Sequence, residues 1–333
     1  MTVRANRLDN QVVHIDLATG AVTPFVTERG LHNVHVTNGT HTAMVDTFAS
    51  ANGTRQTLVR NESGHVIATL PSVAQPPKLP VHVEFTTAGP REFDAAIIRP
   101  ENFSPSKRYP VVLSVYAGPG SKMVHDTPTS YLDDQCLANQ GYIVVTIDGR
   151  GTPGRAHDFE RAIKGPLIAL PRQDQIDGLQ ALGKRHHEMD LSRVGVHGWS
   201  FGGYFTAMAT IRRPDVFKVG VAGAPPVDFA DYDTAYTERY LGTPQDDPEG
   251  YRKSNVLTYA DTLKQPLLLM HGITDDNVYF ENTMKLTQAL LHAGKPYDLL
   301  LLPGTHMLPD PIIRARVAER RAQFLSAVLQ PGK

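Results

Sequence analysis

Hydrophobic residues in the second part of the chain follow two alternating patterns. Short runs of consecutive apolar residues predict buried strands of a parallel sheet, and segments with helical periodicity separate the later runs. Strands that alternate with helices are typical of an α/β protein with a doubly wound, mostly parallel sheet. The predicted strands are His82 to Phe85, Phe93 to Ile98, Val111 to Tyr116, Tyr142 to Ile147, Val194 to His197, Val219 to Ala222, Leu267 to His271 and Leu299 to Leu302, and the predicted helices are Tyr131 to Asn139, Arg172 to Arg185, Gly203 to Arg212, Asn282 to Ala293 and Pro311 to Leu329.

The first part of the chain has the composition of a β-meander, in which short apolar stretches are separated by turn residues. A proline-dense segment, residues 71–80, follows it and predicts a domain boundary. We therefore expect an all-β unit over residues 1–78 and an α/β domain over residues 79–333. The predicted strands of the first unit are Val12 to Leu17, Val34 to Val36, Leu58 to Val59 and Val66 to Ile67, with turns at Thr19-Gly20, Asn38-Gly39 and Ser63-Gly64.

Composition and charge bear on the possible partners, on disulfides and metal sites, and on the location of the protein. The 333 residues include 33 basic and 34 acidic ones without a long basic run, which disfavours nucleic acid and membranes as partners. Cys136 is the only cysteine, so an intrachain disulfide and a cysteine-based metal site are excluded. The first residues lack an apolar signal segment and no run reaches 18 apolar residues, so the chain as written predicts a cytoplasmic protein.

The segment Gly198-Trp199-Ser200-Phe201-Gly202-Gly203 lies between a predicted strand and a predicted helix. In this context the motif G-x-S-x-G forms a nucleophile elbow, with the serine on a strained turn and glycines where Cβ atoms would collide. A glycine-rich turn that merely contains a serine is the alternative interpretation. The strand-turn-helix context favours Ser200 as the nucleophile of a hydrolase.

A serine hydroxyl needs a base and an orienting acid, which follow it in α/β hydrolases in the order acid, then histidine. Asp275 lies just after the predicted strand that ends at His271, and His306 lies just after the last predicted strand. Together with Ser200 they fall at the carboxyl edge of the sheet, where α/β proteins bind ligands. Asp275 is the favoured acid, and Asp276, which would equally serve as an N-cap or turn residue, is the alternative.

Acyl transfer also requires hydrogen-bond donors for the oxyanion of the tetrahedral intermediate. The backbone N–H of Phe201, the residue after the candidate nucleophile, is one expected donor. The phenol of Tyr116 is a second candidate, because this residue ends a central predicted strand at the same edge of the sheet. A tyrosine that only packs against the following Gly-Pro turn is the alternative interpretation.

Five motifs occur along the chain in a fixed order. They are Val115-Tyr116-Ala117-Gly118-Pro119-Gly120-Ser121, Asp148-Gly149-Arg150-Gly151, Gly198-Trp199-Ser200-Phe201-Gly202-Gly203-Tyr204, Tyr236-Thr237-Glu238-Arg239-Tyr240, and His271-Gly272 with Asp275-Asp276-Asn277-Val278. Together they resemble the catalytic portion of the prolyl oligopeptidase family of serine peptidases, most closely its dipeptidyl peptidase IV branch. The resemblance implies an α/β-hydrolase fold, a triad of Ser200, Asp275 and His306, and an oxyanion hole of Tyr116 and the Phe201 amide. This chemistry needs no metal and no cofactor.

The resemblance also implies a peptide substrate with proline or alanine before the cleaved bond. A flat-sided aromatic pocket suits a pyrrolidine ring, which offers no hydrogen bond. An amphipathic helix whose tyrosines pack inward is the alternative interpretation of residues 232–240. The implied pocket residues are Trp199, Pro226, Phe229, Tyr232, Tyr236 and Val278, and Asn277 is implied to contact the peptide carbonyl that precedes the pocket.

Several features depart from the family pattern. Phe201 stands where the branch usually has Tyr or Asn, Phe229 where Trp is common, and Met307 where a glycine usually follows the histidine. Residues 1–78 resemble a remnant of about one to two blades of the family's β-propeller, which typically has about four to eight blades. No segment matches the acidic pair with which the propeller of this branch holds the substrate's amino terminus. We therefore expect weakened substrate restriction, and a homodimer that forms through exposed strand edges.

These observations favour a serine peptidase that cleaves after proline or alanine near the amino terminus of a peptide, through an acyl-enzyme. A broad-specificity carboxylesterase with the same triad is the first alternative. An inactive interaction or dimerisation module is the second, and the complete set of triad residues argues against it. The resemblance further implies that full-length relatives are often periplasmic or secreted.

Overall fold

The computed structural model describes residues 2–3, 7–36, 43–165 and 167–332. Two small antiparallel sheets precede the proline-dense segment. The first has the strand order β1 (Thr2–Val3), β2 (Gln11–Ile15), β3 (Val22–Val26), and the second has the order β4 (Gly30–Val36), β5 (Ala43–Ser50), β6 (Arg55–Asn61), β7 (Val66–Leu70). The four predicted strands correspond to β2, β4, β6 and β7, whereas the sequence pattern did not indicate β3 and β5. The predicted turn at Asn38-Gly39 lies outside the described residues.

Two features explain why β3 and β5 escape the sequence pattern. β3 contains Pro24 and is mostly exposed, so no apolar face marks it as a strand. β5 carries the fully buried Asp46, which accepts a hydrogen bond from Arg60 Nε at 2.9 Å and lies 2.9 Å from His32 Nδ1. This partnered charge occupies a position where strand periodicity would require an apolar residue.

The second part of the chain forms one eight-stranded sheet, and the predicted α/β fold is confirmed. The order is β15-β14-β13-β12-β10-β11-β9-β8, with β8 and β9 antiparallel to their neighbours and the other strands parallel. Since β10 lies between β11 and β12, the strand order reverses there, and such a switch point is where open α/β sheets bind ligands. The strands are β8 (Val83–Ala88), β9 (Phe93–Ile98), β10 (Tyr109–Ser114), β11 (Ile143–Asp148), β12 (Met189–Trp199), β13 (Phe217–Gly223), β14 (Leu267–Gly272) and β15 (Asp298–Leu302).

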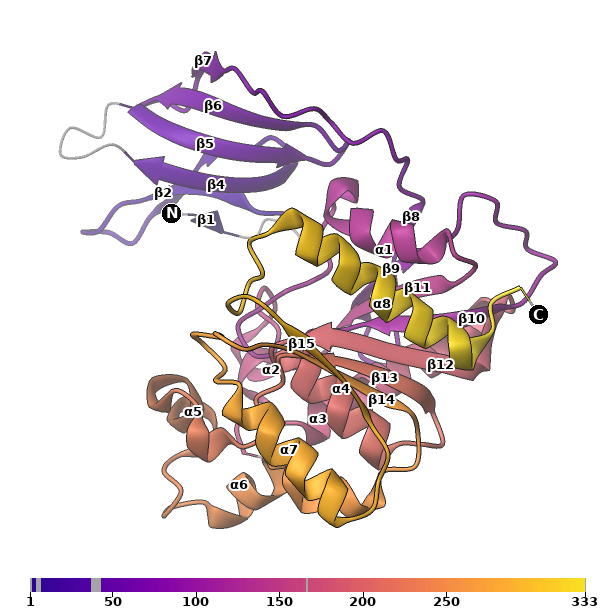
Figure 1. Ribbon diagram of the computed structural model, residues 1–333. Helices are drawn as coiled ribbons and strands as arrows, with labels where there is room; N and C mark the ends of the chain where they lie inside the picture. The colour runs from indigo at the N-terminus through magenta and orange to yellow at the C-terminus, as the bar shows by residue number, and fades with distance from the viewer. Residues whose placement is uncertain (1, 4–6, 37–42, 166, 333) are drawn as a thin grey trace.

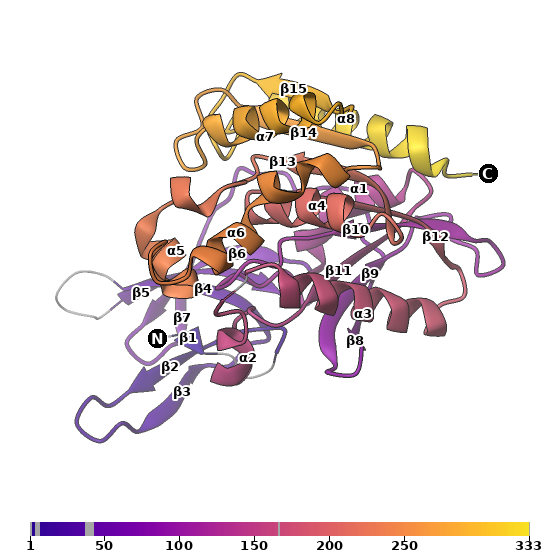
Figure 2. The ribbon, with the colours of Figure 1, turned by 90° about the horizontal axis from the view of Figure 1, so that it is seen from below.

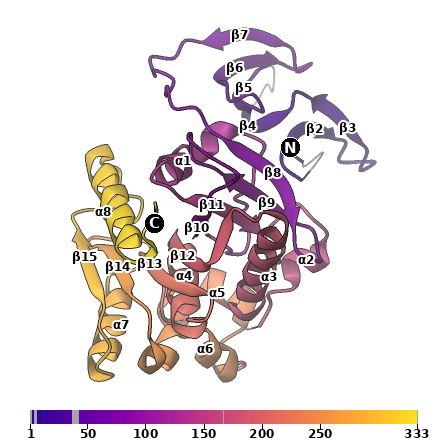
Figure 3. The ribbon, with the colours of Figure 1, turned by 90° about the vertical axis from the view of Figure 1, so that its right-hand side faces the viewer.

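Helices cover both faces of this sheet (Figure 3). One face packs against α1 (Leu132–Ala138) and α8 (Pro311–Leu329), and the other packs against α3 (Ala169–Arg185), α4 (Phe201–Arg212) and α7 (Glu281–His292). All five are predicted helices, although α3 begins earlier than expected because Pro171 is accommodated in its first turn. Shorter elements occupy the connections: η1 (Pro128–Tyr131), α2 (His157–Arg161), η2 (Phe229–Asp231), α5 (Thr234–Leu241), α6 (Pro248–Ser254) and η3 (Val256–Thr262).

The carboxyl ends of the parallel strands and the amino-terminal sheets lie on the same side of the molecule. Figure 1 shows the arrow of β12 pointing to the left, toward α2 and α5. Figure 2 shows β15, α7 and α8 at one side of the structure and the amino-terminal sheets at the opposite side.

None of the helices in the described part of the chain combines the length and apolar character that a membrane-spanning segment needs.

Candidate active site

Ser200 is the single residue between β12 and α4. Its φ of 59° and ψ of −122° place it outside the ordinary regions for a residue with a side chain, so the turn is strained. The turn also approaches β10 closely, because a Cβ on Gly198 or Gly202 would lie 2.3 Å or 2.1 Å from the carbonyl oxygen of Val115. Only glycine fits at these two positions, and the serine is presented at the carboxyl edge of the sheet.

Two loops at the same edge bring an acid and a histidine together. Asp275 follows β14 and His306 follows β15, and Asp275 Oδ2 lies 2.7 Å from His306 Nδ1 with both residues buried. Asp276, the alternative acid, instead accepts the backbone N–H of His306 at 3.4 Å. The indole Nε1 of Trp199 donates to the carbonyl oxygen of His306 at 2.9 Å, which ties the histidine loop to the residue before Ser200.

The carboxylate of Asp275 has three further neighbours that hold it in place. His271 Nε2 lies 3.2 Å from Asp275 Oδ2, and the backbone N–H groups of Asn277 and Val278 donate to Oδ1 at 3.0 Å and 2.8 Å. Burial raises the pKa of Asp275, but hydrogen bonds from His271, His306 and the Asn277 N–H outweigh it and leave the pKa below its ordinary value. The acid is therefore ionised at neutral pH and is ready to orient an imidazole.

His271 is a contributor to the site that sequence reasoning missed. It is fully buried at the end of β14, and its Nδ1 lies 2.7 Å from Thr283 Oγ1. In the sequence it is the polar end of an apolar strand and part of the His271-Gly272 motif, but the sequence analysis assigned it no role in the site. Its place in that motif, four residues before Asp275, is the signal that could have found it, because a tight loop returns the chain to the strand end.

Tyr116 and Phe201 approach Ser200 from two elements. Tyr116 follows β10, and burial together with the neighbouring Tyr232 raises the pKa of its phenol, while a hydrogen bond with Ser200 lowers it only in part. The phenol therefore keeps its proton and lies within hydrogen-bonding reach of Ser200. Phe201 is the first residue of α4, where backbone N–H groups have no acceptor within the helix. Two hydrogen-bond donors are thus available beside the serine.

A buried ionic network supports the loop that follows Tyr116. Asp148, at the end of β11, accepts the backbone N–H groups of Met123 and Val124. The ammonium of Lys122 lies 2.6 Å from Asp94 Oδ2 and 3.3 Å from Asp148 Oδ2, and all three side chains are almost inaccessible. Because Lys122 pairs with both carboxylates, it ties the loop after Tyr116 to β9 and to the end of β11.

Replacing Lys122 by methionine should lower the free energy of unfolding by about 3–5 kcal/mol, because it leaves the buried carboxylate of Asp148 without its cation and that of Asp94 with Arg7 alone. Urea unfolding of the full chain measures the change. Lys285→Met is the matched control, since Lys285 pairs with Asp231 at the surface and its loss should cost about 0–1 kcal/mol. Equal effects of the two substitutions would contradict the role given to Lys122.

A row of aromatic rings extends from Tyr116, and we call Tyr116, Phe201, Phe229, Tyr232 and Tyr236 the aromatic row. Successive ring centroids along it are 6.1, 6.2, 6.2 and 5.6 Å apart. The hydroxyl of Tyr236 is buried and has no hydrogen-bond partner among the described residues. The row is therefore a continuous set of packed aromatic rings that begins beside Ser200, and it also carries a polar group without such a partner.

Of the remaining predicted pocket residues, Asn277 contacts this row. Asn277 Oδ1 accepts a hydrogen bond from the Tyr232 hydroxyl at 3.3 Å, and Pro226 and Val278 are buried. Trp199 does not join the row, since its recorded contacts are with His306 and Gly223. The structure thus brings Asn277 to the row, and it places Trp199 beside His306 and Val278 beside Asp275.

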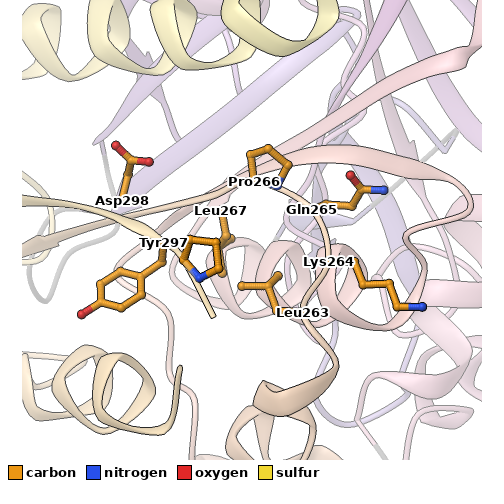
Figure 4. A pocket seen from close by; sticks show the side chains of 8 residues that line it. Leu263, Lys264, Gln265, Pro266, Leu267, Tyr297 and Asp298 are labelled. Atoms are coloured by element: carbon orange, nitrogen blue, oxygen red, sulfur yellow. The ribbon is translucent and has the colours of Figure 1, made fainter. Parts of the chain in front are cut away.

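A different pocket, drawn in Figure 4, lies away from these residues. Its lining includes Leu267 and Asp298, which begin β14 and β15, so it lies at the amino ends of these strands. Ser200, Asp275 and His306 are all at the carboxyl ends. The pocket of Figure 4 therefore plays no part in the candidate site.

An eight-stranded, mostly parallel sheet with a strained serine between strand and helix defines an α/β hydrolase. The sequence profile of the prolyl oligopeptidase family matches residues 129–332. The chain belongs to this family of serine peptidases, and the resemblance inferred from the five motifs is confirmed.

The most similar relatives considered are dipeptidyl peptidases. Dipeptidyl peptidase 8 of Homo sapiens is 43% identical over 212 residues, 62% of this chain and 24% of the relative. A protein named probable dipeptidyl-aminopeptidase B from Coccidioides posadasii (strain C735) is 38% identical over 235 residues, 69% of this chain and 25% of the relative. The crystal structure of Porphyromonas gingivalis dipeptidyl peptidase 4 superposes with a TM-score of 0.85 at 31% identity, over 97% of this chain and 47% of that one. The chain thus spans about a quarter of these curated relatives and less than half of the solved structure.

Proposed function

We propose that this chain is the catalytic part of a serine peptidase that cleaves after proline or alanine near the amino terminus of a peptide. The observation that carries the proposal is the convergence at one sheet edge of a strained Ser200, the Asp275–His306 pair and the phenol of Tyr116. Family membership and the dipeptidyl peptidase names of the relatives support the substrate class.

In this mechanism Ser200 Oγ attacks the carbonyl carbon of the scissile bond, and His306 accepts its proton. Asp275 holds the imidazole through Nδ1 and stabilises the imidazolium that forms. The phenol of Tyr116 and the N–H of Phe201 donate to the oxyanion. His306 then protonates the leaving amine, and water attacks the acyl-enzyme by the same steps in reverse order.

We assign the aromatic row, Pro226 and Val278 to the side chain before the cleaved bond. A proline ring has a compact apolar surface and no donor, and aromatic faces cover such a surface without leaving a polar group unpaired. Asn277, on the far side of Tyr232, is positioned to contact the preceding peptide carbonyl. Trp199, which the resemblance implies as a pocket residue, lies beside His306 instead and is assigned no contact with this side chain.

We further propose that residues 1–78 are blades of a β-propeller and that residues 79–333 are the hydrolase domain. The superposition on the Porphyromonas gingivalis structure, which extends over 97% of this chain, supports this division. No helix or strand occurs between β7 and β8, and residues 71–79 are exposed except for one partly buried position. Because no segment matches the acidic pair of the dipeptidyl peptidase branch, the chain by itself restricts peptide length only weakly.

Parallel assays of Gly-Pro-p-nitroanilide and p-nitrophenyl acetate test the proposed function. Release of p-nitroaniline supports the peptidase. Ester hydrolysis without anilide hydrolysis would replace it by the carboxylesterase alternative. Failure of both assays, with no labelling of Ser200 by a fluorophosphonate, would indicate an interaction module instead.

Tyr116→Phe should lower kcat for Gly-Pro-p-nitroanilide by about one to three orders of magnitude, because one oxyanion donor is lost. KM should change little, since the phenol donates mainly in the transition state. Tyr259→Phe is the control, because Tyr259 lies in η3, where its ring contacts Arg212. Unchanged kcat in Tyr116→Phe would remove this residue from the mechanism.

We propose that the chain self-associates into a homodimer through its exposed sheet edge. β7 is the last strand of its sheet, and Val66, Ile67 and Leu70 on it are exposed. An unpaired apolar edge is a template for pairing with another chain. Light scattering should give twice the chain mass, and Ile67→Lys should return the monomer mass. A monomer at micromolar concentration would contradict this proposal.

A further inference from the structure

A recess of about 510 Å³ opens beside the candidate active site. Pro119, Gly120 and Gly151 form one side, and they belong to the loops that follow β10 and β11 at the carboxyl edge of the sheet. The other side is formed by α2 with the residues just after it, and by Arg239 and Tyr240 at the end of α5. The mechanism described above uses none of these side chains.

The recess adjoins the aromatic row directly. The ring of Tyr240 lies 5.2 Å from that of Tyr236, the last member of the row. The backbone of Gly120 donates to Gly151 at 3.3 Å, and that of Gly165 donates to Tyr240 at 2.8 Å, so hydrogen bonds join the walls. A peptide held against the row therefore has the recess within reach of its neighbouring groups.

The charge of the lining is predominantly positive. Three cations, Arg161, Lys164 and Arg239, surround the recess, and all three are exposed. The one carboxylate of the lining, Glu160, accepts the backbone N–H of Gly154 at 3.0 Å. We call Arg161, Lys164, Arg239 and Tyr240, with the loop residues opposite them, the cationic recess.

The three cations have no ion pair and no side-chain hydrogen bond to any residue that the structure describes. Some exposed cations elsewhere are paired, as Arg252 is with Glu249 and Arg316 with Glu319, whereas Lys184 and Arg314 have no ion pair to any described residue. A single unpaired surface cation is ordinary. Here three unpaired cations surround one recess, and the recess adjoins the aromatic row. Together they form a receptor for an anion. A guanidinium binds a carboxylate through two parallel hydrogen bonds, and an ammonium adds a point charge.

We propose that the cationic recess binds a carboxylate of the peptide substrate and so makes the enzyme prefer peptides with an acidic group close to the cleaved bond. The proposal rests on the proposed function, because the substrate is taken to be a peptide held against the aromatic row. The carboxylate is supplied either by an acidic side chain or by the free carboxyl terminus of a short peptide. Because the three cations are exposed, the preference weakens as salt screens them.

The test compares quenched fluorescent peptides that contain Gly-Pro and carry Asp or Asn at one position next to the proline. Each is made with a free and with an amidated carboxyl terminus. We expect kcat/KM to be about tenfold higher for the charged member of one pair at low salt. A preference for Asp assigns the recess to an acidic side chain, and a preference for the free terminus assigns it to the carboxyl end.

The triple substitution Arg161→Gln, Lys164→Gln and Arg239→Gln should reduce that ratio to about one, while Lys184→Gln on α3 should leave it unchanged. All the substituted side chains are exposed, so the fold is not at risk. A preference that survives the triple substitution would overturn the proposal. Equal kcat/KM for all charged and neutral members would also overturn it.

A binding measurement separates failure of the recess from failure of the proposed function. Fluorescence anisotropy of the same peptides, labelled and mixed with the Ser200→Ala chain, gives the ratio of Kd without turnover. If no peptide is hydrolysed but the charged member binds about tenfold more tightly through the three cations, the peptidase proposal fails and the recess remains. Equal Kd values in this assay would reject the recess even if the enzyme is active.

Discussion

Alanine in place of Ser200 should lower kcat for Gly-Pro-p-nitroanilide by about five to six orders of magnitude, since removal of the nucleophile leaves only binding and oxyanion stabilisation. The affinity for peptide should be retained, because the aromatic row and Asn277 are untouched. Single-turnover kinetics and fluorophosphonate labelling measure the loss directly.

Ser106→Ala is the control for this substitution. Ser106 lies in an exposed loop, where its hydroxyl meets only that of Ser104, so the variant should retain full activity. The backbone of Ser200 is strained with a positive φ, and alanine there meets the same constraint as serine. Unfolding should therefore be nearly unchanged in Ser200→Ala. Residual turnover within tenfold of the unsubstituted enzyme would mean that another group is the nucleophile.

Asparagine in place of Asp275 should lower kcat by about four orders of magnitude, because the neutral amide no longer fixes the tautomer of His306 or stabilises its charged form. Asp276→Asn is the matched control. Asp276 accepts only the backbone N–H of His306 at 3.4 Å, and its loss should cost less than about tenfold. Profiles of kcat against pH for both variants separate the two neighbouring acids. The larger loss in Asp276→Asn would reverse the assignment.

The same substitution changes how stability depends on pH. The pKa of Asp275 in the folded chain lies below its ordinary value of 3.8, so the ionised acid stabilises the fold at pH values above 3.8. This contribution is lost as the pH falls through the lower, folded-state pKa. Urea unfolding should therefore show a decline of stability in acid that is larger for the unsubstituted chain than for Asp275→Asn. A decline of equal size in the variant would show that other carboxylates account for it.

Local patterns predicted the architecture of the hydrolase part well. Most of the strands are buried apolar runs, and even the mostly exposed β15 is an apolar run in sequence, so a short window of sequence is enough to predict them. The amino-terminal sheets were predicted only in part, since β5 buries the charged Asp46 and β3 is mostly exposed. A pattern that depends on apolar faces cannot report strands that are stabilised by ion pairs or by edge pairing.

The glycines of the Ser200 turn are a local sequence pattern that a tertiary contact requires. The glycines at 198 and 202 are needed because the turn passes within van der Waals contact of the carbonyl of Val115, on a strand more than 80 residues earlier in the chain. The motif therefore records a tertiary contact in local sequence. This is why one short segment could point to Ser200 before any neighbour was known.

The sequence by itself determined the alternation of strands and helices, the strained serine turn and the small set of acids and histidines that follow later strands. Only the tertiary structure decided that Asp275 rather than Asp276 meets the imidazole of His306, that His271 supports the same carboxylate, and that the phenol of Tyr116 reaches Ser200. The reason is physical: periodicity and glycine spacing act over a few residues, whereas these contacts depend on which strands are neighbours and on the direction in which each side chain leaves its loop.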